Sequence, residues 1–228
     1  VMDHKWEIRF MSDAKLTPAR RPERGAIAGR HVRLEPLSAA HGAALFRNLG
    51  GTENAGLWTY MADGPFLSRA DFDAAMARRA AGGDPLFFAI APQGGEAVGI
   101  ASLMRIDAGN GVIEVGGIVF GATLAQSAAA TEAIYLLAGY VFDGLGYRRF
   151  EWKCDDRNVA SKKAAERFGF RYEGLFRQHM VVKGGNRDTA WFSMLDREWP
   201  ARKAAFETWL APENFDASGR QRQPLARD

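Results

Sequence analysis

Cysteine and histidine are scarce in this sequence of 228 residues, which contains one cysteine, Cys154, and four histidines. A single cysteine cannot form a disulfide within the chain, and scattered histidines without a cysteine partner disfavour a metal site. The sequence has no apolar run of about 18 residues, so we expect no membrane span, and residues 1–10 lack the basic start and apolar centre of a signal peptide. We therefore expect a cytoplasmic protein that holds no metal.

Charge of one sign is also limited, because the net charge is only +3 and the basic residues are dispersed. The densest basic group is Arg20, Arg21 and Arg24, near the N-terminus. Nucleic-acid binding requires a clustered basic face, so we expect no nucleic-acid partner. One alternative stays open, in which residues 15–30 bind RNA or the ribosome, and it predicts binding that weakens steeply with salt.

The chain is predicted to form one domain between two polar ends. Apolar residues make up 47% of the sequence, which is enough for a packed core. Residues 1–30 are punctuated by proline and glycine and show no lasting apolar period, which indicates an N-terminal extension. Residues 211–228 are predicted to form a polar tail, and residues 31–210 the domain itself.

Within this domain the apolar pattern changes repeatedly between a strand period and a helix period. It predicts strands over 31–37, 86–91, 97–106, 112–120, 148–155, 170–182 and 189–195, and helices over 38–49, 69–81, 128–144, 158–168 and from about 200. Neighbouring strands favour antiparallel pairing, and the strand–helix–strand unit in the middle favours one parallel pair. We expect an α/β (α+β) fold with a mixed sheet that binds ligands where the strand order splits.

Glu114 is a carboxylate in an otherwise apolar strand, and two adjacent glycines, Gly116 and Gly117, follow it. Adjacent glycines in a strand indicate a bulge or the close approach of a ligand. A carboxylate is costly to bury unless it has a partner or a function. Glu114 is therefore either a general base with a raised pKa or a surface carboxylate paired with an arginine, and the spacing alone slightly favours the second.

Small residues lead from this strand into the apolar helix predicted at 128–144. The first amides of a helix lack partners within it, and together with the helix dipole they suit a phosphate group. The same small residues would also allow tight packing against a neighbour. The segment 121–131 is thus a candidate phosphate site, although it matches no known phosphate-loop fingerprint.

The short helix predicted at 158–168 carries two polar residues on its inward face. Ser161 lies on the apolar stripe, and Asn158 lies at the N-terminal end of the same face. Either both face a ligand, or Asn158 is an N-cap and Ser161 bonds to the backbone. His179, in an apolar and basic strand, is either an acid–base group or a structural histidine.

Five stretches of the sequence resemble the GNAT superfamily of N-acetyltransferases, and within it the branch that acetylates the N-terminal alanine or serine of ribosomal proteins. They are GRHVRLEPL at 29–37, LWTYMADGPF at 57–66, IEVGGIVF at 113–120, the block 130–195 with DDRNVASKKAAERFGFRYEG at its centre, and EWP at 198–200. The resemblance covers roughly 31–200, and the block 130–195 is its most specific part. It implies a GNAT fold, in which two central parallel strands splay apart around acetyl-CoA between flanking helices.

The resemblance also implies roles for individual residues. Glu114 takes the position of the family's general base, and Asn158 and Ser161 match the pair that faces the thioester, with His179 or a water assisting. The pantetheine arm is expected beside Gly117, Ile118 and Val119, the pyrophosphate on Gln126, Ser127, Ala128, Ala129, Ala130 and Thr131, and the amine acceptor beside Trp58, Tyr60 and Met61.

Two features depart from the family's pattern. Alanine occupies both small positions of the phosphate loop, Ala128 and Ala130, and Ala165 stands where many members carry a tyrosine acid. These departures motivate a second hypothesis, a CoA-binding or sensing module with little or no catalysis. The first hypothesis is acetyl transfer to a peptide N-terminus or a small amine, and the resemblance adds a homodimer paired through the C-terminal strands.

Overall fold

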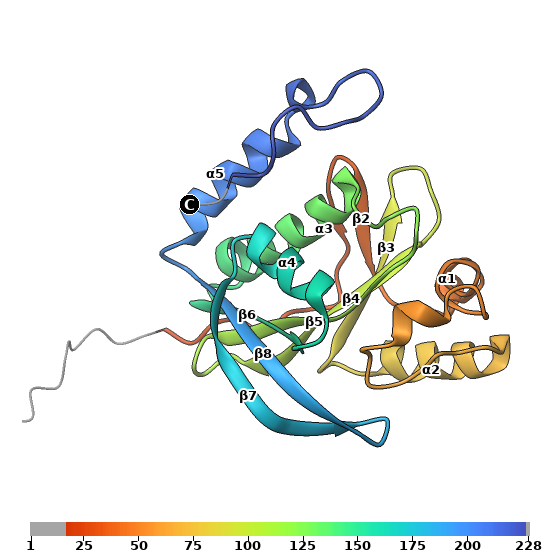
Figure 1. Cartoon of the computed structure of the whole chain (residues 1–228). Coiled ribbons are helices and arrows are strands. Elements are labelled where there is room, and N and C mark those ends of the chain that lie inside the picture. The colour runs from red at the N-terminus through yellow and green to blue at the C-terminus, as the bar shows by residue number, and fades with distance from the viewer. Residues whose placement is uncertain (1–16, 227–228) are drawn as a thin grey trace, which may run out of the picture.

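A computed structural model describes residues 17–226 of the chain, and within them the centre is an eight-stranded sheet (Figure 1). The strand order is β1-β2-β3-β4-β5-β6-β8-β7, and among the described strands β5 and β6 form the parallel pair. The strands are β1 (Ile27–Ala28), β2 (Val32–Pro36), β3 (Leu86–Pro92), β4 (Gly99–Asp107), β5 (Val112–Phe120), β6 (Arg149–Asp155), β7 (Arg171–Val182) and β8 (Gly185–Leu195).

Helices cover both faces of the sheet (Figure 1). The helices are α1 (Gly42–Leu49), α2 (Arg69–Ala81), α3 (Ala128–Gly139), α4 (Val159–Arg167) and α5 (Trp199–Leu210), and a π-helical turn, Tyr140–Gly144, continues α3. The helices α3, α4 and α5 pack on one face and α1 and α2 on the other, so two hydrophobic clusters form. None of the helices in the described part of the chain is both long and apolar enough to cross a membrane.

Strand β3 shows why both faces are buried. Phe88 and Ile90 point into the cluster beneath α3 and α5, whereas Phe87 and Ala89 point into the cluster beneath α1 and α2. Successive side chains of a strand alternate between faces, so a strand that is covered on both sides is a continuous apolar run. The apolar run predicted at 86–91 is therefore confirmed as a central strand.

The parallel pair opens along its length, and this opening positions the functional site. The strands β5 and β6 are paired from Val112 and Arg149 as far as Val115 and Trp152. Both strands continue beyond that point, to Phe120 and Asp155. The pairing of β4 with β5 also shifts register between Ile100 and Ser102, which indicates a bulge. The expected mixed sheet with two splayed parallel strands is confirmed.

The ends of the chain are more closely joined to the fold than the sequence indicates. Strand β1 lies inside the predicted extension 1–30 and pairs with β2, and the tail predicted at 211–228 returns so that Leu225 is buried in the core. Isolated contacts hold these segments, such as the amide of Ala19 on the carbonyl of Ala108 at 3.0 Å, and such contacts leave no apolar period. Residues 1–16 of the predicted extension lie outside the described residues.

Candidate active site

A cavity of about 70 Å³ lies where β5 and β6 diverge. Segments from five parts of the chain meet there, because the sheet order brings β8 beside β6 and the helix α4 follows β6 directly. The lining residues are Tyr60, Val115, Gly116, Gly117, Ile118, Trp152, Lys153, Cys154, Asp155, Asn158, Ser161 and Arg187. Five residues predicted from the sequence, Tyr60, Gly117, Ile118, Asn158 and Ser161, are among them.

The two glycines of β5 are required by the packing behind them. A Cβ atom added to Gly116 would lie 2.4 Å from Met104 Sδ, and one added to Gly117 would lie 2.8 Å from Phe87 Cε1. Gly117 also has a φ of +60°, a conformation that side chains disfavour. The bulge therefore exposes β5 backbone, rather than side chains, to the cavity. Val119, also predicted as a cofactor contact, is buried in the cluster beneath α1 and α2.

Glu114 is buried, with a fractional exposure of 5%, and is bound by two cations. Lys153 Nζ lies 2.9 Å and Arg105 Nε 3.0 Å from Oε2 of Glu114. The other oxygen, Oε1, lies beside Gly116, 3.3 Å from where a Cβ would stand. Burial raises the pKa of Glu114, and the ion pairs with Lys153 and Arg105 oppose that rise. The residue is paired with an arginine, as the second alternative predicted, but the edge or surface position of that alternative is wrong, because Glu114 is buried and its pKa is raised.

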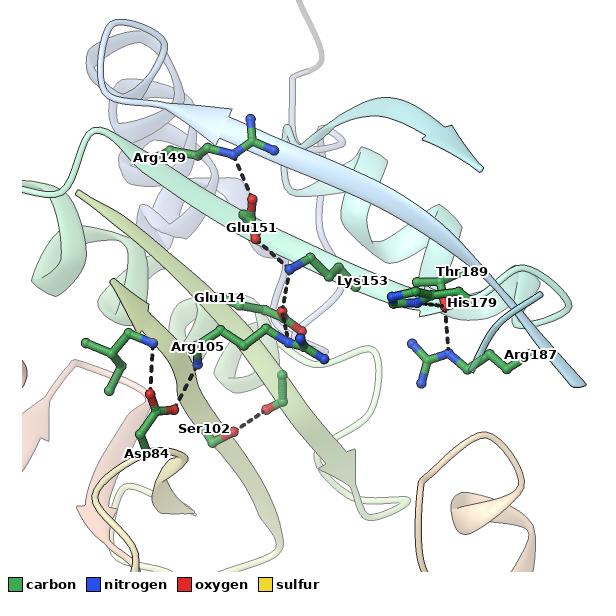
Figure 2. A network of polar contacts seen from close by, with 12 residues as sticks. Asp84, Ser102, Arg105, Glu114, Arg149, Glu151, Lys153, His179, Arg187 and Thr189 are labelled. Atoms are coloured by element: carbon green, nitrogen blue, oxygen red, sulfur yellow. Dashed lines mark hydrogen bonds and ion pairs between the residues drawn. The ribbon is translucent and has the colours of Figure 1, made fainter. Parts of the chain in front are cut away.

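Lys153 connects Glu114 to a row of alternating charges along β6 (Figure 2). Its ammonium lies 2.6 Å from Glu151 Oε2 and 3.9 Å from the ring centroid of Trp191, and Arg149 Nε is 2.8 Å from Glu151 Oε1. Sequence reasoning missed Lys153 as a site residue. The signal was present, because charged residues alternate along β6 on one face, but only the register that pairs Glu114 with Glu151 identifies the partner.

Asn158 and Ser161 serve the helix and the cavity together. Asn158 Oδ1 accepts from the Ser161 amide at 3.0 Å, which is an N-cap of α4, and Ser161 Oγ accepts from Trp152 Nε1 at 2.9 Å. Because the indole donates to the serine oxygen, the serine keeps its own proton to donate. Burial raises the pKa of the adjacent Cys154 thiol, and a hydrogen bond with Ser161 opposes this.

His179 lies on the hairpin of β7 and β8, outside the set of residues that line the cavity. Its Nδ1 is 3.0 Å from Thr189 Oγ1, and its ring packs against Phe176 and Trp191. Burial lowers the pKa of His179, and the cations Arg105, Arg187 and Lys153 lower it further. These contacts describe a structural histidine that is held neutral at neutral pH, and its assisting role stays a prediction.

The predicted phosphate loop forms the N-terminus of α3. Ser127 is the N-cap and its Oγ accepts from the Ala130 amide at 3.1 Å, while Gln126 has a φ of +58°. The amides of Ala128 and Ala129 occupy the first two helical positions, where the helix itself offers no acceptor. The positive φ that glycine would favour thus falls on Gln126, before both alanines. On the same turn, Thr131 Oγ1 accepts from Arg167 Nη1 at 3.1 Å.

The three predicted acceptor residues lie at different depths. Trp58 is completely buried, donates from Nε1 to the carbonyl of Leu49 at 2.7 Å and packs edge-on against Phe66. Tyr60 lines the cavity, and its hydroxyl donates to the carbonyl of Arg157 at 3.2 Å. Met61 is half-buried against the cluster beneath α1 and α2. Of the three, Tyr60 has direct access to the cavity, and Trp58 lies behind the surface.

Within residues 17–226, no group of three or more histidine, cysteine, aspartate or glutamate side chains is arranged to hold a metal ion. The opening between β5 and β6 determines the class of the protein instead. Parallel strands that splay around a cavity, with a helix beginning beside the gap, define the acyltransferase fold that the sequence resembles. Ser161 lines this gap, whereas Glu114 is not part of the lining: it lies next to the lining residue Val115 and is bonded to Lys153, which lines the gap.

The chain belongs to the acetyltransferase (GNAT) domain family, whose sequence profile matches residues 31–171. A solved GCN5-related N-acetyltransferase from Brucella melitensis is 52% identical, covers 92% of this chain and 96% of its own, and superposes with a TM-score of 0.91. An uncharacterised N-acetyltransferase of Bacillus licheniformis is 33% identical over 113 residues, and a protein of Bacillus subtilis named provisionally as a ribosomal N-acetyltransferase is 30% identical over 109.

The alignments with the two Bacillus proteins cover 50% and 48% of this chain, and 63% and 59% of those proteins. The chain therefore matches less than two thirds of the length of these relatives. The family profile and the Brucella structure carry the assignment, because the profile spans β5, β6 and α4 and the structure covers 92% of this chain. The GNAT family suggested by the sequence stretches is confirmed, and the branch within it stays a prediction.

Proposed function

We propose that the protein transfers an acetyl group from acetyl-CoA to a primary amine, either a peptide N-terminus or a small amine, in a reducing cytoplasm. The observation that carries the proposal is the cavity between β5 and β6, with Glu114 on one face of the sheet and Ser161 on the other. The buried free thiol of Cys154 is consistent with that compartment. Exposed apolar side chains on the edge strand β7, among them Phe176 and Val181, support the proposed homodimer.

The residues present fit acetyl-CoA at three points. Beyond Val115 the backbone of β5 is not paired with β6. The backbone N–H and C=O groups of Gly117 and Ile118, which line the cavity, therefore suit the amides of a pantetheine arm. The first amides of α3 suit a pyrophosphate. The hydroxyl of Ser161 lines the cavity, accepts from the indole of Trp152 and keeps its own proton, so it suits the sulfur of a thioester.

Acetyl-CoA, when bound, supplies an acetyl group on a thioester, which a neutral amine attacks directly. Glu114 removes the proton of the amine, directly or through water, and Oε1 is the atom that receives it because both ion pairs end on Oε2. Ser161 donates its hydroxyl hydrogen bond toward the departing sulfur. Tyr60 and Met61 contact the acceptor. The buried Trp58 packs beneath this segment, and its backbone carbonyl accepts a hydrogen bond from Lys183 Nζ at 2.6 Å.

The direct test measures thiol release from acetyl-CoA with a panel of peptides and small amines, and acetyl-CoA binding by calorimetry. Turnover with at least one amine at a rate well above hydrolysis supports the proposal. Binding of acetyl-CoA without acetylation of any amine would contradict it and favour the CoA-binding module instead.

Replacing Ser161 with alanine is expected to lower kcat for the best acceptor about tenfold, because the hydroxyl stabilises the departing sulfur in the transition state. The KM for acetyl-CoA should change by less than about threefold, since Asn158 still caps α4. Ser193→Ala is the matched control, because it also removes one serine hydroxyl, but from a side chain that bonds to Glu173 and does not line the cavity. Equal kcat values for all three proteins would exclude this role for Ser161.

Replacing Ala128 with proline is expected to weaken acetyl-CoA binding about tenfold, because it deletes one amide that faces the proposed pyrophosphate. Proline is tolerated at the first position of a helix, and Ser127 before it is extended, with a ψ of 168°. Arg69→Pro is the matched control, at the first position of α2. Calorimetry measures both variants. An unchanged Kd for Ala128→Pro, with an unchanged melting temperature, would place the pyrophosphate elsewhere.

A further inference from the structure

The charges on the Glu114 face of the cavity are matched except at one residue. Glu114 is paired with Lys153 and Arg105, and Asp155 Oδ2 is 2.7 Å from Arg157 Nη2. Arg187, from β8, donates from Nε to Thr189 Oγ1 at 3.1 Å and lines the cavity. Among residues 17–226, no carboxylate lies within ion-pair distance of Arg187, so its two terminal nitrogens are not committed to an acid.

The charged groups that surround His179 on this face are cations. Its ring lies beside Thr189 and near Arg187 (Figure 2). The charged groups that act on its pKa are Arg105, Arg187 and Lys153, and all three lower it. Burial lowers it as well and is the larger cause. Two of these cations, Lys153 and Arg105, are already paired with Glu114, so Arg187 is the one of the three that has no ion pair with a described residue.

We propose that the amine acceptor carries a carboxylate close to its amine, and that Arg187 binds this carboxylate. The inference rests on the proposed function and restricts the amine acceptor to molecules that also carry a carboxylate. Arg187 and the backbone beside Glu114 line the same small cavity. An acceptor whose amine lies near Glu114 would therefore have a neighbouring carboxylate within reach of Arg187. A guanidinium with two uncommitted nitrogens matches a carboxylate in a planar, two-bond arrangement.

The same arrangement discriminates against cationic amines. Lys153 already occupies the position beside Glu114 that a second cation would take, and Arg187 and Arg105 would repel it. A polyamine is therefore a poor acceptor, although Glu114 and Glu151 alone would attract one. Two sources supply the favoured chemistry: the α-carboxylate of a free amino acid, and an acidic side chain next to a peptide N-terminus.

The test compares matched acceptors with the full chain and saturating acetyl-CoA. One arm uses alanine against alaninamide, the second uses Ala-Glu-Ala-amide against Ala-Gln-Ala-amide, and spermidine is the cationic probe. In at least one arm the acid is expected to exceed its amide about tenfold in kcat/KM. Arg187→Gln should reduce that ratio to about two, through KM rather than kcat, and Arg187→Lys should restore part of it.

The matched control is Arg177→Gln, which removes the same charge from the same hairpin, but from an exposed side chain beside Asp188 and outside the cavity. It should keep the wild-type ratio. A wild type that acetylates amides or spermidine as well as acids would overturn the inference while acetyl transfer itself stood. An unchanged ratio in Arg187→Gln would also overturn it, whereas failure to acetylate any amine would overturn the proposed function.

Discussion

Replacing Glu114 with glutamine is expected to lower kcat/KM for acetyl transfer about 10²–10³-fold, which is the largest loss expected from any single substitution proposed for this protein. The amide keeps the shape of Glu114 but cannot accept a proton from the attacking amine. Binding of acetyl-CoA should stay within about twofold, since Glu114 faces the other side of the sheet from α3. Lys153 keeps its second ion pair with Glu151, so the fold should persist.

The pH profile separates a catalytic carboxylate from a structural one. Burial raises the pKa of Glu114 above its ordinary value of 4.5, and only the ionised form accepts a proton. Activity of the wild type should therefore rise with pH through an acid limb that lies above pH 4.5, and this limb should be lost in Glu114→Gln.

The matched control for this substitution is Glu151→Gln. It removes one charge from the same network but leaves the carboxylate at position 114, so its loss in kcat/KM should stay below about tenfold. Comparable losses in the two variants would show that the network as a whole, and not Glu114, carries the effect. A wild-type acid limb that survives in Glu114→Gln would assign the base elsewhere.

Much of the site was predictable because its signals are local. Alternation along β5 placed Glu114 and Gly116 on one face, and the spacing of three residues placed Asn158 and Ser161 together on α4. Lys153 beside Glu114 and Arg187 in the cavity lining were not predicted, because their positions depend on pairings across the sheet, such as Glu114 with Glu151 and Lys153 with Trp191. Nothing within a single strand records which residue lies across from it.

The burial of each aromatic side chain was the second property that the sequence did not determine. Trp58 and Tyr60 are two positions apart in one aromatic stretch, yet the first is completely buried and the second lines the cavity. Aromatic residues suit both a core and a binding surface, so their type does not distinguish the two. The burial of Trp58 follows from its hydrogen bond to Leu49 and from packing against α2, both of which are tertiary contacts.

The N-terminal segment was also underestimated, because one of the side chains that bind it is buried and comes from a distant part of the sequence. Glu132, on α3, is 5% exposed and accepts three backbone amides, from Arg30 at 2.9 Å, His31 at 2.6 Å and Val32 at 3.0 Å. Gly29 leaves room for it, since an added Cβ would lie 2.6 Å from its carboxyl carbon. One glutamate thus joins the turn between β1 and β2 to the helix whose N-terminus is the proposed phosphate site.

Replacing Glu132 with alanine is therefore expected to lower the free energy of unfolding by about 3 kcal/mol, because three amides lose their acceptor and a cavity remains. For a chain of this size that corresponds to a fall in melting temperature of about 6 to 12 °C. Glu207→Ala is the matched control: Glu207 is an exposed helical glutamate with Tyr135 as its partner, and its loss should cost less than about 1 kcal/mol. Denaturant unfolding measures both. If Glu132→Ala were as stable as the wild type, water would replace the carboxylate, and the turn between β1 and β2 would not depend on α3.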